Sequence, residues 1–190
     1  TCTTQGYTTK TCSVCGDESK TNYVDALGHT YRSDESTVVT KRATSTVEGN
    51  IHYKCDVCNA ETDKVIAKIG KISLSYSSVA YDGKTKKPTV TVYDVNGKKI
   101  STSYYTRVFS NNKNIGTATV QVKFKGNYSG TISKTFKIVP KKVSGVKASK
   151  VTTSSITLKW TKISGVTGYT VYDSSTGKTV ATIKKNTNTV

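Results

Sequence analysis

Two C-x-x-C motifs carry the clearest chemistry in this sequence, Cys12-x-x-Cys15 and Cys55-x-x-Cys58. A two-residue spacer lets both thiolates of a motif point at one tetrahedral metal ion, and two such loops are the halves of a zinc ribbon. We therefore expect a structural zinc site whose four ligands are these four thiolates. Because a shell of four protein ligands has no open position for water, the site would support folding and not hydrolysis.

Two other assignments of the cysteines stay open, since 39 residues separate the motifs and the usual spacing is about 15 to 20. In one, Cys2 and His29 complete a local site with the first motif, while His52 and a further group complete a second site with the second motif. In the other, each motif of an exported chain closes its own disulfide, although so short a ring stabilises little. His29 is then a turn residue and His52 an exposed strand residue.

The two motifs lie in an internal repeat with an offset of 43 residues. With Thr1 placed over Thr44, seven positions between Thr1 and Glu18 find an identical partner, including both cysteines of the motif. Each copy predicts a β-hairpin in which a glycine turn precedes a strand that ends in the C-x-x-C loop. Residues 1–69 are therefore expected to form a zinc-ribbon-like hairpin pair.

The composition predicts an all-β protein. The chain of 190 residues has 12 Tyr, no Met and only two Pro, and it is rich in Thr, Ser, Val and Lys, which argues against a helical bundle or a doubly wound α/β enzyme. Its apolar runs are far shorter than the roughly 18 residues of a membrane span. No charged and then apolar leader opens the sequence, so we expect an internal or processed fragment without a membrane span.

The charge is divided between two regions. Residues 1–69 hold 8 Lys or Arg and 9 Asp or Glu, whereas residues 70–190 hold 21 and 3, a net charge of +18. The basic region has a single Arg, Arg107, and its lysines are scattered, whereas proteins that bind nucleic acid favour Arg and concentrate charge in a patch. We expect a solvated β surface that attracts an anionic polymer such as a cell-wall polysaccharide, and no nucleic-acid partner.

From residue 70 onward, apolar and polar residues alternate, which predicts short antiparallel strands. A sandwich is expected over residues 70–140, a linker begins at Pro140, and a further β region covers residues 141–190. The expected strands are 72–76, 89–93, 118–122, 131–139, 155–160, 168–172 and 179–183.

The last region resembles the first half of a fibronectin type III domain, with Trp160 in the core position of its second strand and Tyr169 at the start of its third. The resemblance implies a sandwich of about 100 residues, and only about half of that length follows the linker. We therefore expect a partial fibronectin type III-like sandwich. A strand from another chain could complete its sheet by self-association.

Residues 80–131, with Asp82-Gly83 and Gly126-Asn127-Tyr128, resemble a bacterial immunoglobulin-like domain. The first region, with its C-x-x-C loops and Gly28-His29-Thr30-Tyr31, is similar to CxxC-containing repeats that precede such domains. These resemblances imply a multi-domain surface protein of gut Firmicutes, secreted and displayed on the bacterial cell surface. The immunoglobulin-like β-sandwich would then follow the hairpin pair.

Catalysis is not expected, because residues 70–190 contain no His, Cys or Glu and only three Asp. A hydrolytic triad or a pair of catalytic carboxylates can hardly be assembled from them. The expected function is a structural or adhesive stalk that acts as a spacer and is stabilised by zinc. The alternatives are a module in which Tyr104, Tyr105 and Tyr128 stack on cell-wall or dietary polysaccharide, and a subunit of an extracellular filament.

Overall fold

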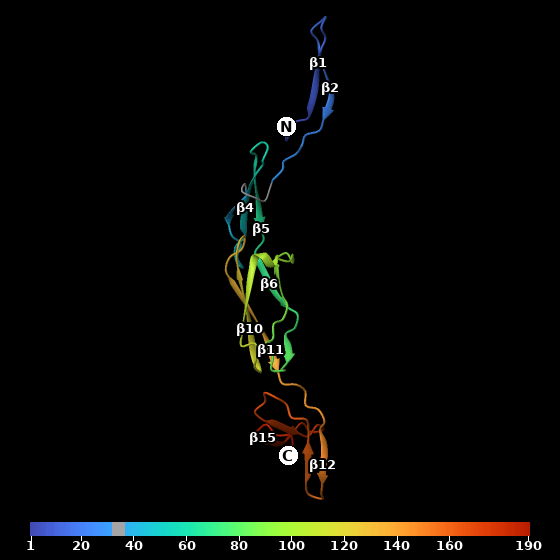
Figure 1. The fold of residues 1–190 in the computed structure, drawn as a ribbon, viewed down its shortest axis with the longest axis vertical. Helices are drawn as coiled ribbons and strands as arrows, with labels where there is room; N and C mark the ends of the chain where they lie inside the picture. Colours follow the sequence, from blue (N-terminus) through green and yellow to red (C-terminus); the bar gives the residue numbers. More distant parts are fainter. Residues whose placement is uncertain (32–36) are drawn as a thin grey trace. The chain divides into compact units, whose positions relative to one another are not determined.

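The computed structural model describes residues 1–31 and 37–190 and confirms an all-β protein (Figure 1). Its regular elements are β-strands and one short 3₁₀ helix, η1 (Thr102–Tyr104). The chain divides into two compact units. Unit 1 contains Thr1–Lys71, Tyr93–Tyr104 and Phe124–Gly130, and unit 2 contains Ile72–Val92, Tyr105–Lys123 and Thr131–Val190. No helix in the described part of the chain is long and apolar enough to cross a membrane.

The first unit contains the two predicted hairpins. One is a two-stranded sheet of β1 and β2, and the other is part of a three-stranded sheet in the order β3-β4-β5. The internal repeat is preserved in the strand pairing, because Thr11 pairs with Glu18 as Lys54 pairs with Glu61. The strands are β1 (Gly6–Thr11), β2 (Glu18–Val24), β3 (Thr37–Lys41), β4 (Gly49–Lys54) and β5 (Glu61–Ile66).

The two hairpins differ in what covers them. Ala43, Ile51 and Ile66 form a buried cluster beneath β3, β4 and β5, and Tyr53 and Tyr128 pack against it. In contrast, every residue of β1 is exposed. Among the described residues, β1 has a strand neighbour on one edge only, whereas β4 lies between two strands. The second hairpin therefore has a small core, and the first is held mainly by its own backbone hydrogen bonds.

The central part of the chain forms a four-stranded sheet in the order β7-β11-β10-β9 and a two-stranded sheet of β6 and β8. Burial alternates along β10, where Ala118, Val120 and Val122 are fully buried, as the period-two pattern predicts. Ala118, Phe136 and Ile138 form one core cluster. The strands are β6 (Ile69–Leu74), β7 (Ser78–Ala80), β8 (Val90–Asp94), β9 (Tyr105–Ser110), β10 (Gly116–Phe124) and β11 (Thr131–Val139).

The last region consists of two hairpins, in which β12 (Lys147–Val151) pairs with β13 (Ile156–Lys159) and β14 (Tyr169–Tyr172) pairs with β15 (Thr179–Ile183). Trp160 directly follows β13 and is buried, and its ring centroid lies 5.0 Å from that of Tyr169. The Tyr169 hydroxyl accepts a hydrogen bond from the Ile163 N–H and donates one to the Asn186 side chain. This aromatic pair is the centre of a small core.

Candidate metal centre

Four side chains with metal-binding atoms gather in the first unit: Cys2, His29, Cys55 and Cys58. Each offers one ligand atom, and the four atoms all lie within 4.8 Å of one another. The Sγ atoms of Cys2 and Cys55 are 3.9 Å apart, and the Cys58 Sγ lies 3.2 Å from Nδ1 of His29. Three thiols and one imidazole thus lie close enough together to hold one metal ion.

The C-x-x-C loop between β4 and β5 presents two of these ligands. The Cys55 N–H donates to the Ala60 carbonyl at 2.8 Å, and the Asn59 N–H donates to the Cys55 carbonyl at 3.0 Å. Asn59 has a φ of 59°, a left-handed conformation that Asn adopts more readily than most residues. This tight turn brings the side chains of Cys55 and Cys58 to one side of the loop.

The other two ligands come from the chain on either side of the first hairpin. The Gly28 N–H donates to the Cys2 carbonyl at 2.9 Å and so holds the segment before His29 against the N-terminal turn. Beyond His29, Tyr31 forms a β-bridge with Cys55. Gly28 has a φ of 72°, which a residue with a Cβ rarely adopts, so this turn depends on glycine.

The donor atoms and one sulfur–sulfur distance are compatible with a tetrahedral metal ion. A Zn–S bond of about 2.3 Å implies roughly 3.8 Å between two sulfur ligands at tetrahedral angles, close to the observed Cys2–Cys55 separation of 3.9 Å. A disulfide needs about 2.05 Å between its sulfurs, and all five cysteines are free thiols in the structure. Thiolate and imidazole ligands favour zinc over the hard cations calcium and magnesium.

Burial and hydrogen bonding shift the pKa values of two of these thiols in opposite directions. The N–H groups of Cys58 and Val57 lower the pKa of Cys55 to about 6, which favours its thiolate form. Burial, followed by the neighbouring thiols of Cys58 and Cys55, raises the pKa of Cys2 to about 11. A bound cation must therefore displace the proton of Cys2, which makes metal binding dependent on pH.

The first C-x-x-C motif lies outside this cluster. Cys12 and Cys15 occupy the loop between β1 and β2 and are both exposed, and the Cys15 Sγ lies 3.4 Å from a carboxylate oxygen of Asp17. The N–H and the thiol of Cys15 lower the pKa of Cys12 to about 7. The structure thus groups the second motif with Cys2 and His29, and it does not place the first motif beside them.

The sequence contains a signal for this grouping in the positions where the repeat fails. At an offset of 43 residues, Cys2 corresponds to Ser45 and His29 corresponds to Ile72. The thiol and the imidazole that occur only in the first copy are those that meet the C-x-x-C loop of the second copy. The two ligands that the first copy contributes to the loop of the second copy can therefore be found in the sequence as metal-binding residues that the second copy lacks.

His52, an alternative ligand in the sequence analysis, points to a different partner. Its Nδ1 lies 2.8 Å from a carboxylate oxygen of Asp63, and its Nε2 lies 3.7 Å from Glu61. The hydrogen bond from His52 lowers the pKa of Asp63. His52 and Asp63 face each other across β4 and β5, where they form a cross-strand pair.

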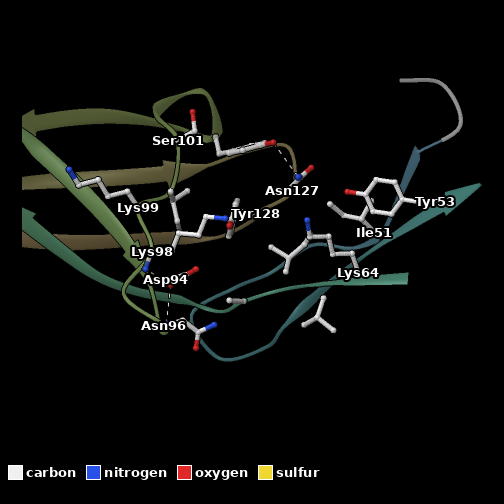
Figure 2. A pocket seen from close by; sticks show the side chains of 15 residues that line it. Ile51, Tyr53, Lys64, Asp94, Asn96, Lys98, Lys99, Ser101, Asn127 and Tyr128 are labelled. Carbon is white, nitrogen blue, oxygen red and sulfur yellow. Dashed lines mark hydrogen bonds between the residues drawn. The ribbon is translucent and has the colours of Figure 1, made fainter. Parts of the chain in front are cut away.

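The three tyrosines suggested for carbohydrate binding differ in exposure. Tyr105 is buried, with 5% of its surface exposed, and its hydroxyl donates to the Val90 carbonyl. Tyr104 and Tyr128 are half-buried, and their ring planes meet at 63° with centroids 5.5 Å apart. Both line a half-open groove of about 500 Å³ in the first unit, together with Lys64, Lys98 and Lys99 (Figure 2).

Comparisons with known proteins give no relative for this chain. No known protein family matches it, and the searches of curated proteins and of solved structures find no match either.

Proposed function

We propose that this chain is a non-catalytic structural segment of a bacterial surface protein, a stalk or spacer of small β modules whose N-terminal hairpins are joined by a structural zinc ion. The observation that carries the metal cross-link in this proposal is the convergence of the Cys2, His29, Cys55 and Cys58 ligand atoms within 4.8 Å. Zinc would link three segments far apart in the sequence. Binding energy of this kind contributes directly to folding.

A structural role fits the ligand count better than a catalytic one. Catalytic zinc sites keep one position for water or substrate, whereas three thiolates and one imidazole fill a tetrahedral shell. The remaining chemistry of the chain is sparse, since residues 70–190 contain no His, Cys or Glu. The zinc ion would therefore act as a cross-link.

The module organisation belongs to the same proposal. Alternating burial in β10 supports an immunoglobulin-like sandwich over residues 70–140, and the Trp160–Tyr169 core supports a partial fibronectin type III-like sandwich over residues 141–190. The resemblance to surface proteins of gut Firmicutes supports an extracellular location and a role in adhesion. The high lysine content of residues 70–190 favours attraction to an anionic cell-wall polymer.

The test is zinc stoichiometry by native mass spectrometry on the reduced full chain, with two matched double variants. We expect one zinc in the native chain, none in Cys55→Ser/Cys58→Ser, and one in Cys12→Ser/Cys15→Ser. Loss of zinc from both variants would instead support the four-thiolate ribbon predicted from the motifs. A native chain that binds no zinc under reducing conditions would refute a structural zinc site.

The groove of Figure 2 favours a second candidate, binding of an anionic polysaccharide. Two half-buried tyrosines offer ring faces or edges to sugars, and nearby lysines offer positive charge. Affinity gel electrophoresis with polygalacturonate tests it. We expect Lys98→Gln/Lys99→Gln to reduce retardation more than Lys184→Gln/Lys185→Gln, which removes the same charge outside the groove. Equal losses would refute a site in the groove.

A further inference from the structure

The C-x-x-C loop of the first hairpin has the backbone conformation of the loop that forms the metal centre. The Gly16 N–H donates to the Cys12 carbonyl at 3.0 Å, as the Asn59 N–H does to the Cys55 carbonyl. The Cys12 N–H donates to the Asp17 carbonyl at 2.8 Å, the same length as the bond from Cys55 to Ala60. Both loops thus present a pair of thiols in the same way.

The two hairpins differ in the groups that cover them. Cys55 has 0% of its surface exposed, whereas its counterpart Cys12 is exposed. On the second hairpin, β3 pairs along the outer edge of β4, and the Tyr31 bridge extends this cover to the loop. In the described part of the chain, the corresponding edge of β1 pairs with no strand.

Gly49 and Gly6, which occupy equivalent positions in the two hairpins, indicate independently that the first hairpin lacks, within residues 1–31 and 37–190, a chain segment packed against the free edge of β1. A Cβ on Gly49 would lie 2.5 Å from the Ala43 backbone nitrogen and 2.6 Å from the Lys41 carbonyl oxygen, so the chain leaving β3 requires glycine there. Gly6 occupies the same place on β1, yet the nearest atom to its Cβ position is 3.8 Å away, on Val24. Neither glycine has a positive φ, so conformation does not explain either one. The first hairpin thus retains the space for a covering chain.

The copy that supplies the ligands to the metal centre shows which residues the missing segment must contain. The C-x-x-C loop of the second copy takes its thiol and imidazole from the copy that precedes it, at Cys2 and His29. The second copy has Ser45 and Ile72 at these places and cannot supply a further site in the same way. The loop of the first copy would require an equivalent thiol and imidazole from another copy.

We propose that Cys12 and Cys15 are half of a second zinc site, which a further copy of the repeat completes when joined ahead of Thr1. The partner is a segment with a Thr-Cys turn, a Leu-Gly-His-Thr-Tyr segment and a strand that pairs with the free edge of β1. Each zinc ion then fastens one repeat to the next, so that a series of repeats becomes a continuous metal-linked array. The inference rests on the proposed zinc site at Cys55 and Cys58.

The experiment uses the full chain extended by a tandem duplicate of residues 1–43 ahead of Thr1. This arrangement places a second Thr-Cys turn and a second Gly-His pair ahead of Cys12. Their cysteine and histidine are then as many residues from Cys12 as Cys2 and His29 are from Cys55. Both cysteines of the duplicate's own C-x-x-C are changed to serine, so that it contributes only one thiol and one imidazole. Native mass spectrometry under reducing conditions counts zinc, and hydrogen exchange reports on β1.

We expect one zinc in the native chain and two in the extended chain, with slower amide exchange along β1. Cys12→Ser/Cys15→Ser in the extended chain should return the count to one, whereas Ser13→Ala in the same loop should leave it at two. One zinc in both the native and the extended chain would overturn this inference and leave the first site intact. No zinc in the native chain would refute the proposed function instead.

A zinc-bridged dimer of the native chain would also overturn the inference. In such a dimer, Cys12 and Cys15 of two molecules would form a site of four thiolates, which needs no imidazole-bearing partner. Native mass spectrometry of the unextended chain separates this outcome, because it would show two chains with three zinc ions.

Discussion

Replacing Gly49 with alanine tests the packing that positions the metal centre. The new Cβ would lie 2.5 Å from the Ala43 nitrogen and 2.6 Å from the Lys41 carbonyl oxygen, whereas an ordinary contact is at least about 3.4 Å. Because both neighbours are backbone atoms next to a fully buried Ala43, the chain leaving β3 must move by almost an ångström. Overpacking of this kind costs about 1–3 kcal/mol.

Gly6→Ala is the matched control, since Gly6 holds the same position in the first hairpin and has no atom within 3.8 Å of its Cβ site. There the added methyl makes only an ordinary van der Waals contact with Val24, and alanine reduces the freedom of the unfolded chain. We expect Gly6→Ala to be neutral or to stabilise the hairpin by up to about 1 kcal/mol.

Amide hydrogen exchange in the full chain measures both changes locally, because opening of each hairpin is reported by its own amides. A cost of about 1–3 kcal/mol corresponds to exchange about 5 to 150 times faster across β4 in Gly49→Ala. In Gly6→Ala, exchange across β1 should be unchanged or slower. Equal acceleration of β4 and β1 in their respective variants would refute the reasoning from backbone clearance.

Three further predictions concern the zinc ion and the central core. Chelation of zinc with EDTA should accelerate amide hydrogen exchange in β4 and leave exchange in β11 unchanged. Zinc at 100 times its dissociation constant stabilises the folded state that binds it by about 2.7 kcal/mol, and chelation removes this contribution. Equal acceleration in both strands would contradict a stabilising effect of zinc that is confined to the N-terminal hairpins. Competition titrations should show zinc affinity falling at least about tenfold for each pH unit between 8 and 6, because the pKa of Cys2 is raised to about 11 and its proton must leave on binding. The fall should be steeper below pH 6, where Cys55 also takes up a proton. An affinity independent of pH would exclude these thiols as ligands. Ile138→Ala, at a side chain with 1% of its surface exposed, should destabilise the central sheet by about 2–5 kcal/mol in urea denaturation, whereas Val108→Ala, at 59% exposed, should stay within about 0.5 kcal/mol. Similar midpoints for both variants would contradict the assigned core.

The sequence alone predicts seven of the ten strands from β6 to β15, because alternation between two faces is a local property, and it misses β7, β9 and β12. The expected strand over 131–139 coincides with β11, and the expected strand over 118–122 lies within β10. The repeat offset likewise predicts two hairpins with the same C-x-x-C loop, and these appear with matching strand register. In each case, neighbouring residues contain the whole signal.

The sequence alone also shows that the N-terminal region has metal-ligand chemistry, since thiols and imidazoles at short spacing are readable from residue types. It does not show which of them meet, because Cys2 and Cys55 are 53 positions apart and come together through the pairing of Tyr31 with the second loop and of Gly28 with Cys2. That pairing depends on backbone hydrogen bonds between segments that are distant in the sequence. Residue types alone do not predict which segments form such bonds. The amino-acid sequence thus determines the β-strands and the kind of metal chemistry, and the tertiary structure decides that consecutive repeats share one site.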